Sequence, residues 1–443
     1  MASFDLLIRN GTCVNHMGIG AGDVGITAGR IAALGDLSQA SAARTIDARG
    51  LHVLPGVIDT QVHLREPGLE HKEDLETGAR AAILGGVTAV FEMPNTKPST
   101  TTAAALADKL SRAKGRMACD YAFYVGASPD NVDVLGELER LPGCAGVKMF
   151  MGSSTGTLLV AEEPMIRRVL QNGRRRMAVH SEDEARLEAR KPLRRPGDPS
   201  SHPVWRDAET ARLSTERLLR LARETGRRVH VLHVTTADEL PLIAAHRDVA
   251  TAETTPQHLT LAAPDCYDRL GTLAQMNPPI RDAAHRDALW RAVSEGIIDV
   301  IGSDHAPHTL TEKGGTYPDT PSGMTGVQTL LPLLLDHVNA GRLTLQRLVE
   351  LTSLGAHRTF GIACKGRMTV GFDADLTIVD LSADRVIENK WIASRCGWTP
   401  FDGLRVRGWP KGTIVRGTVA MWEDELTSQP MGAPIRFEET LIS

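Results

Sequence analysis

The middle of the chain alternates between short apolar, β-branched runs and longer stretches in which apolar residues recur three or four positions apart. Short apolar runs are typical of buried strands, and the wider spacing is typical of amphipathic helices. The runs that predict strands are Val53–Ile58, Val87–Glu92, Cys119–Gly126, Gly146–Phe150, Met177–His180, Val229–Val234, Val249–Glu253 and Ile298–Ser303. The helical spacing is clearest over Leu75–Leu84, Ala103–Arg112, Met165–Asn172 and Ala208–Thr225. This alternation indicates parallel βα units of an α/β protein, and we expect a closed (β/α)8 TIM-like barrel.

Both ends of the chain have a different pattern, in which strand-like pieces are separated by Gly and Asn turns. Phe4–Arg9 and Asp23–Thr27 are examples near the N-terminus, and Asp375–Asp380 and Val419–Trp422 are examples near the C-terminus. Neither end alone is long enough to bury a core of its own. We therefore expect residues 1–54 and 365–443 to form one small β-sandwich domain, with residues 55–364 as the barrel. The alternative is two independent flaps on the barrel.

Composition narrows the class of protein. A chain of 443 residues is too long for one core of ordinary size, which agrees with a barrel plus a small domain. The net charge of −4 gives no reason to expect nucleic acid or a membrane surface as a partner. The N-terminus lacks the pattern of a signal peptide, and no apolar stretch approaches the ~20 residues of a membrane span. Six cysteines without CxxC spacing are typical of reduced thiols, so we expect a cytoplasmic protein.

Polar side chains follow the predicted strands at their carboxyl ends. In chain order they are Gln61, His63, Arg65, Asn95, Lys148, His180, His233 and Asp304. In a barrel these strand ends meet at one face, where active sites lie. Each residue alone has an ordinary structural explanation, since a lone histidine is more often a core residue and an aspartate after a strand often caps a helix. Their joint position at the same end of so many strands favours one site.

The residue types indicate a metal-dependent hydrolase. Imidazole and carboxylate together suit Zn²⁺ and similar divalent ions. Asp304 is suited to transferring a proton between water and a leaving nitrogen. Lys148 becomes a ligand if CO₂ converts its amine to a carbamate. Arg65 is suited to gripping a substrate carboxylate, and Asn95 can donate and accept hydrogen bonds beside it.

Four motifs carry a resemblance to a known family. They are "GSDHAPHTLTEK" at residues 302–313, "HLREPG" at 63–68, "MPNTKP" at 93–98 and "MNPPIR" at 276–281. With the β-rich "FDLLIRNG" opening and the closing "GFDADLTIVD", the sequence resembles the amidohydrolase superfamily over almost its whole length. Within that superfamily it is most similar to the dihydroorotases, a group of cyclic amidohydrolases.

The resemblance implies a role for each matching residue. It implies one or two metal ions, Zn²⁺ or another divalent metal, with His63 and Asp304 at the first and His180 and His233 at the second. Lys148 would be the carboxylated lysine that bridges them, and Asp304 would also be the general acid/base. The substrate carboxylate would be held by Arg65, Asn95 and His308, and the pyrimidine ring by Asn277 and the loop Pro321–Gly326. The reaction would be the reversible closure of N-carbamoyl-L-aspartate to L-dihydroorotate, a step of pyrimidine synthesis.

The sequence departs from the family pattern at two positions. The family's first motif is His-x-His, and here it is Gln61-Val62-His63. A glutamine amide binds zinc less well than imidazole, so the first metal is expected to be weak, absent or of a different kind. Gln257 stands where the first of two adjacent histidines is expected, but it lies beyond the ligand positions that the resemblance implies.

Two other functions stay open at this stage. One is a sister activity, that of an allantoinase or a hydantoinase/dihydropyrimidinase. Arg65, Asn95 and His308 together favour a substrate with a free carboxylate, which counts against a hydantoinase. The other is a weakly active or inactive scaffold subunit for aspartate transcarbamoylase. The resemblance also implies a homo-oligomer, either a dimer or a tetramer.

Overall fold

A computed structural model describes residues 3–154 and 158–441. Its centre is an eight-stranded parallel sheet in which each strand pairs with the next along the chain. The strands are β6 (Val57–Val62), β7 (Val87–Glu92), β8 (Asp120–Gly126), β9 (Cys144–Phe150), β10 (Met177–His180), β11 (Val229–Val231), β12 (Ala250–Thr254) and β13 (Val300–Ile301). A parallel bridge between Val62 and His305 joins the first strand to the segment after the last one. The sheet thus closes into a barrel, and this part of the predicted fold is confirmed.

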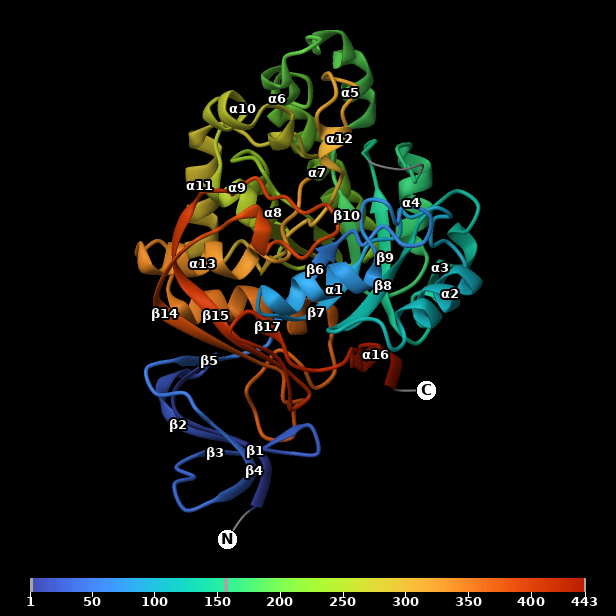
Figure 1. The fold of residues 1–443 in the computed structure, drawn as a ribbon. Coiled ribbons are helices and arrows are strands. Elements are labelled where there is room, and N and C mark those ends of the chain that lie inside the picture. The colour runs from blue at the N-terminus through green and yellow to red at the C-terminus, as the bar shows by residue number, and fades with distance from the viewer. Residues whose placement is uncertain (1–2, 155–157, 442–443) are drawn as a thin grey trace.

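Helices surround the barrel on its outer side (Figure 1). The longer ones are α1 (Leu75–Leu84), α2 (Ala103–Ala113), α4 (Glu163–Gln171), α7 (Ala208–Thr225), α11 (Ala283–Ser294) and α13 (Leu330–Asn339). Shorter ones are α3 (Leu135–Leu138), α5 (Glu184–Arg190), α6 (His202–Trp205), α8 (Glu239–Ala244), α9 (Pro256–Thr260), α10 (Asp265–Leu270), α12 (Leu310–Lys313), α14 (Leu345–Val349), α15 (Gly355–Phe360) and α16 (Glu438–Leu441). The four helices predicted from apolar spacing are α1, α2, α4 and α7, with bounds shifted by at most two residues. Their buried faces pack against the barrel in one continuous core.

The two ends of the chain share a nine-stranded mixed sheet that lies below the barrel in Figure 1. Its strands are β1 (Ser3–Asn15), β2 (Gly18–Thr27), β3 (Arg30–Gly35), β4 (Ser41–Asp47), β5 (His52–Pro55), β14 (Leu376–Val386), β15 (Arg405–Val415), β16 (Thr418–Trp422) and β17 (Glu425–Leu426). Antiparallel pairing of β5 with β14 joins the N-terminal strands to the C-terminal ones. The expectation of a joint β-structure, rather than two separate flaps, is confirmed. The proposed boundaries at residues 54/55 and 364/365 stay a prediction.

The predicted first strand, Val53–Ile58, was wrong as a single element. It divides at Gly56 into β5, which belongs to the mixed sheet, and β6, which begins the barrel. A glycine is needed at this crossing because an added Cβ would lie 2.3 Å from the hydroxyl of Thr88. Since β6 runs on to Val62, Gln61 lies within the strand and His63 directly after it.

The C-terminal segment closes the lower end of the barrel. Ile435 and Phe437 belong to the hydrophobic cluster inside the barrel, where Phe437 packs edge-on against Phe91 with ring centroids 5.7 Å apart. The guanidinium of Arg175 lies 4.2 Å from the centroid of the same ring. All six cysteines are free thiols, as expected. Among the described residues, no helix is long and apolar enough to cross a membrane.

Candidate active site

The carboxyl ends of the barrel strands surround a small pocket. Of the residues predicted from the sequence, those that line it are Gln61, His63, Arg65, Lys148, His180, His233, Asn277 and Asp304. Ser322 and Gly323, from the loop Pro321–Gly326, also line it. Asn95 and His308 do not line the pocket but contact residues that do. The structure thus brings the predicted residues together around one pocket.

Three of these residues have a backbone conformation that is unusual for a side chain other than glycine. The φ angles are 64° at Arg65, 37° at His233 and 44° at Asp304. Such left-handed conformations cost about 1–3 kcal/mol each and are concentrated at functional sites. All three lie where a barrel strand turns into the following loop, so the strain is concentrated around the pocket.

His63 and Gln61 both face Asp304. The Nε2 atom of His63 lies 3.3 Å from Oδ1 of Asp304, and its Nδ1 atom lies 2.9 Å from Oδ1 of Asn95. Because the Asn95 oxygen accepts, Nδ1 carries the proton and Nε2 presents a lone pair to the carboxylate. The side-chain amide of Gln61 donates to Oδ1 of Asp304 at 3.0 Å. The other amide atom, Oε1, is buried and has no hydrogen-bond partner among the described residues.

His180 and His233 face each other on the neighbouring strands. Nδ1 of His180 lies 3.0 Å from Nε2 of His233, and the Nε2–H of His180 donates to Oε2 of Glu182 at 2.8 Å. Glu182 also pairs with Arg206, which holds the pKa of this carboxyl well below its usual range. An ionised Glu182 fixes the tautomer of His180, so that Nδ1 presents a lone pair to the pocket.

Lys148 and Asp304 are the two titratable groups of the pocket whose protonation matters most for the expected reaction. Burial lowers the pKa of Lys148 to about 7, although Asp304 and Glu253 oppose the shift. Burial raises the pKa of Asp304 to about 7, and Lys148 and His180 oppose that shift. A lysine with such a pKa is about half neutral at pH 7, and the neutral amine is the form that reacts with CO₂. A carboxyl with such a pKa can both take and give a proton near neutrality.

Arg65 presents a cationic group to the pocket. Its Nε donates to the carbonyl of Pro307 at 3.1 Å, and its Nη2 lies 3.2 Å from Nε2 of His308. Nη1 is buried and has no hydrogen-bond partner among the described residues. Burial lowers the pKa of Arg65 to about 10, which leaves the guanidinium charged at neutral pH. The site therefore contains a buried positive charge, and the N–H groups of its Nη1 are available to an acceptor.

Lys313 and His202 hold the part of the pocket wall that is formed by the loop Pro321–Gly326 and Asn277. Nζ of buried Lys313 donates to the carbonyls of Gln275 and Pro321, both at 3.0 Å. Oδ1 of Asn277 accepts from Nε2 of His202 at 2.9 Å. These contacts connect the loop and Asn277 to the surrounding protein, so both are held in place before any substrate arrives.

Sequence reasoning missed several residues of the site. Phe150 and Ser154 line the pocket, and the ring of Phe150 lies 4.5 Å from Nζ of Lys148. Glu182 and Glu253 are fully buried beside predicted residues, and burial raises the pKa of Glu253 to about 8. A glutamate two positions after a predicted ligand, as in "HSED", is a signal that was available for Glu182. No comparable pattern distinguishes Glu253.

Comparison with known proteins decides the family. Residues 50–119 match the family model described as dihydro-orotase-like, and residues 211–420 match the amidohydrolase family. A dihydroorotase of Halobacterium salinarum is 37% identical over 387 residues, which is 87% of this chain and 89% of that one. The chain belongs to the amidohydrolase family, among the members that act on cyclic amides. Proteins of this family generally use a metal-ion site.

The names of similar amidohydrolases differ in substrate. An allantoinase of Rubrobacter xylanophilus is 36% identical, with 98% of each chain covered. The solved structure of an L-hydantoinase (dihydropyrimidinase) from Arthrobacter aurescens superimposes with a TM-score of 0.93 at 32% identity, covering 98% of this chain and 99% of that one. The fold and the general reaction are thus shared by enzymes of several specificities, and the choice of substrate depends on the pocket.

Proposed function

We propose that this amidohydrolase is a dihydroorotase, which interconverts N-carbamoyl-L-aspartate and L-dihydroorotate with the help of one or two divalent metal ions, such as Zn²⁺. The observation that carries the proposal is the buried guanidinium of Arg65, whose Nη1 has no partner among the described residues. A substrate carboxylate would pair with it, and the ring of hydantoin or allantoin carries no carboxylate to do so. An unpaired buried charge is costly, so the pocket favours an anionic substrate.

The donor atoms around the pocket fit a metal ion. Among the described residues, no group of three His, Cys, Asp or Glu side chains is placed to hold one, and Lys148 is the further residue of the pocket that would supply a ligand. As a carbamate, Lys148 would supply this ligand, and His180, His233, His63 and Asp304 would be the other ligands. The facing nitrogens of His180 and His233 are 3.0 Å apart, close to the ~3.3 Å expected of two nitrogens bound to one tetrahedral zinc. When bound, the metal would polarise the ring amide carbonyl and supply a nucleophile at neutral pH.

The protein's own residues would perform the remaining steps. Arg65 would hold the carboxylate, with Asn95 and His308 supporting His63 and Arg65 from behind. Asp304 would accept a proton from water during hydrolysis and deliver it to the ring nitrogen as the amide bond breaks. In the direction of ring closure the same carboxyl would carry the proton the other way. The pKa of about 7 of Asp304 suits both directions.

A substrate panel tests this proposal. The purified protein, supplied with zinc and bicarbonate, is assayed with L-dihydroorotate, N-carbamoyl-L-aspartate, hydantoin, dihydrouracil and allantoin. We expect turnover of the two carboxylate-bearing compounds only. Arg65→Gln is expected to raise KM for them about 100-fold, or about 3 kcal/mol, whereas Arg140→Gln, on the exposed outer surface, leaves KM unchanged.

The second candidate is a hydantoinase or allantoinase, because relatives with those names cover almost the whole chain. Turnover of hydantoin or allantoin without dihydroorotate would establish it. No turnover of any compound, with or without added zinc, would instead support the scaffold reading. The homo-oligomeric state, an association with aspartate transcarbamoylase and a cytoplasmic location stay predictions.

A further inference from the structure

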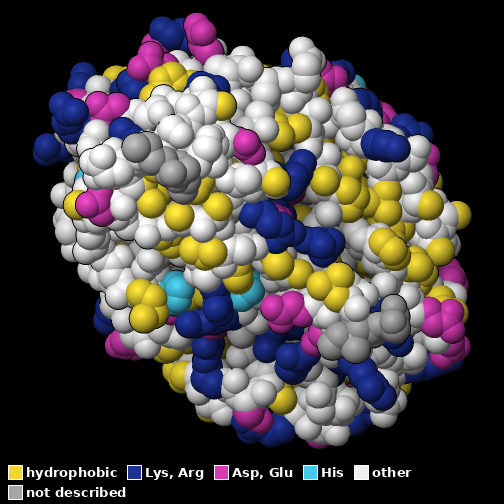
Figure 2. Space-filling model, turned by 90° about the horizontal axis from the view of Figure 1, so that it is seen from below, with side chains coloured by type: hydrophobic (Ala, Val, Ile, Leu, Met, Phe, Trp, Pro, Cys, Tyr) yellow, Lys and Arg dark blue, Asp and Glu magenta, His cyan; other side chains and the backbone are white. Residues whose placement is uncertain are grey.

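A second pocket lies at the opposite end of the barrel from the candidate active site. Asp120, which lines it, is the first residue of β8, whereas the active-site residues follow the strand ends. Its walls come from the mixed sheet, the base of the barrel and the C-terminal segment, and its volume is about 580 Å³. That is within the usual range for pockets that bind small molecules, about 300–1,000 Å³. Figure 2 shows this underside of the molecule, where Lys and Arg side chains gather near the middle of the face.

The lining of this basal pocket is rich in cations. Its cationic side chains are Arg30, Lys365, Arg416 and Arg436, and its carboxylates are Asp120 and Asp373. Asp375 lies behind Lys365, 2.6 Å from its Nζ, and adds a third carboxylate to the group. Four cations against three carboxylates leave one positive charge over. In the sequence these residues are scattered from position 30 to position 436, so only the fold brings them together.

Ion pairs within the group already use its carboxylates. Asp120 is buried and pairs with Lys365 at 2.6 Å and also with Arg416, while its Oδ1 accepts from the backbone of Ala433 at 2.8 Å. Asp373 lies 3.1 Å from Lys365 and 3.6 Å from Arg30. The ammonium of Lys365 therefore has a carboxylate for each of its three protons. These contacts explain how the C-terminal segment is attached to the barrel base, but they leave Arg436 unexplained.

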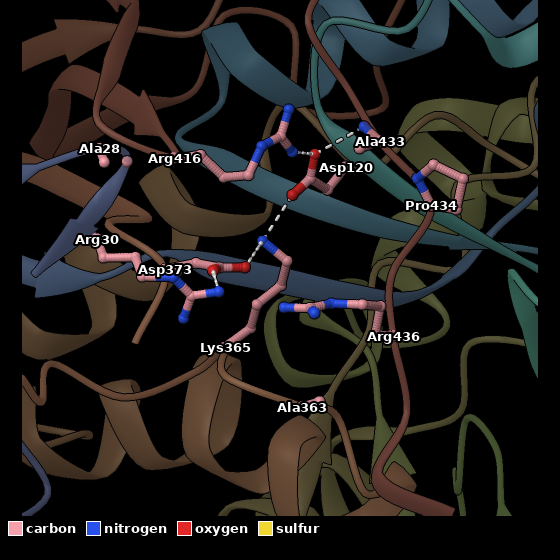
Figure 3. Close-up of a pocket in the computed structure, with 11 residues that line it drawn as sticks. Ala28, Arg30, Asp120, Ala363, Lys365, Asp373, Arg416, Ala433, Pro434 and Arg436 are labelled. Carbon is pink, nitrogen blue, oxygen red and sulfur yellow. Dashed lines mark hydrogen bonds and ion pairs between the residues drawn. The ribbon is translucent and has the colours of Figure 1, made fainter. Parts of the chain in front are cut away.

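Arg436 extends into the basal pocket, and its side chain is exposed. Among the residues that the structure describes, no hydrogen bond or ion pair engages its guanidinium. Figure 3 shows the Arg436 and Arg30 side chains entering from opposite sides, with Lys365 between them. Like charges around one cavity repel each other, and an anion between them removes that cost. Two guanidinium groups supply planar, paired donors that match the oxygens of a phosphate.

We propose that the basal pocket binds a phosphate dianion, either free or carried by a small metabolite. Arg436 would supply the main contact, and Arg30 would approach from the mixed sheet. Ala28, Gly29, Ala363 and Pro434 complete the walls with little polar surface, which leaves room for an organic group attached to the phosphate. A bound phosphate would connect the C-terminal segment to the mixed sheet across the barrel base. The site is independent of the chemistry at the strand ends.

Calorimetric titration with inorganic phosphate at low ionic strength tests the proposal. We expect saturable binding to the unmodified protein, about tenfold weaker binding to Arg436→Gln and an intermediate effect in Arg30→Gln. Arg174→Gln, another exposed arginine, is the matched control and should bind as the unmodified protein does. Arg65→Gln should also bind normally, which separates the basal pocket from the active site. Because Arg436 is exposed and has no ion-pair partner among the described residues, its variant is expected to retain the thermal stability of the parent.

Two further probes distinguish the sources of the phosphate. If the pocket accepts a phosphorylated metabolite, adenosine monophosphate binds more tightly than inorganic phosphate and adenosine does not bind. If inorganic phosphate binds as tightly as the monophosphate, the site takes the free ion. Absence of saturable binding, equal binding in every variant, or loss of binding in Arg65→Gln but not in Arg436→Gln would overturn the proposal.

Discussion

Oε2 of Glu182 lies 2.8 Å from Nε2 of His180 and 2.5 Å from Nη2 of Arg206. The carboxylate therefore orients the imidazole that faces His233 across the pocket. Partners of this kind typically change metal affinity by about 10–100-fold when they are removed. We expect Glu182→Gln to weaken zinc binding by that amount, measured by competition with a chelating dye.

Loss of folding would make this result ambiguous, because Glu182→Gln leaves Arg206 buried without its partner. The double variant Glu182→Gln/Arg206→Met removes both charges and should retain the fold while still lacking the carboxylate beside His180. Glu239→Gln is the matched control, since the hydrogen bonds that buried Glu239 accepts come from Thr215 and Thr236. Unchanged zinc affinity in the double variant would show that Glu182 does not position His180.

Gln61 is the second place where metal binding can be tested. Its amide donates to Asp304 while its own oxygen has no partner among the described residues. Imidazole binds zinc better than an amide oxygen does, so Gln61→His is expected to raise the metal content toward about two ions per chain. Elemental analysis measures the content, and Gln171→His on the outer surface controls for adventitious binding by a new histidine. An unchanged content would mean that Gln61 is not the limiting ligand.

The sequence predicted the barrel because each strand is a short apolar run and each predicted helix has a regular apolar face. It failed at Val53–Ile58, where the apolar pattern is continuous although the chain passes from one sheet to another. Only the close approach of Thr88 and the pairing of Pro55 with Leu376 show that change. An apolar pattern predicts that a residue is buried, but it does not predict in which sheet the residue lies.

The residues of the candidate site also fall into those that the sequence predicted and those that it did not. Residues at strand ends, such as Lys148 and Asp304, could be predicted because the barrel topology alone brings them together. Glu253 could not, since its neighbours Thr60 and His230 come from other strands of the barrel. The basal pocket around Arg436 could not be predicted either, because residues far apart in the sequence form it.

Lys72, in the loop after β6, contacts His308, which lies next to Arg65. Its ammonium lies 3.1 Å from Nδ1 of His308 and 2.9 Å from the carboxylate of Glu312. Since an ammonium can only donate, Nδ1 of His308 accepts from Lys72, while Nε2 of His308 lies 3.1 Å from the carbonyl oxygen of Ser322 and 3.2 Å from Nη2 of Arg65. If the enzyme is a dihydroorotase, Lys72→Met is expected to raise KM for L-dihydroorotate about fivefold and to change kcat by less than about twofold. Steady-state kinetics beside Lys114→Met, an exposed lysine, measure this. A fall in kcat with constant KM would contradict a role in holding the carboxylate.

Lys313, which donates to the loop Pro321–Gly326, makes the free energy of unfolding of the protein depend on pH. Burial lowers the pKa of Lys313 from 10.5 to about 7, so between these values the unfolded chain binds a proton that the folded protein does not. The free energy of unfolding due to this group therefore rises with pH from about 7 upward, by about 1.4 kcal/mol per pH unit, and is constant at lower pH.

The variant Lys313→Met lacks this pH dependence. We expect the stability of the unmodified protein relative to Lys313→Met to increase by about 2.5 kcal/mol between about pH 6.5 and pH 9, measured by urea denaturation. Lys114→Met, compared in the same way, should show a constant difference, because that lysine is exposed. A constant difference for Lys313→Met as well would show that Lys313 stays protonated in the folded protein.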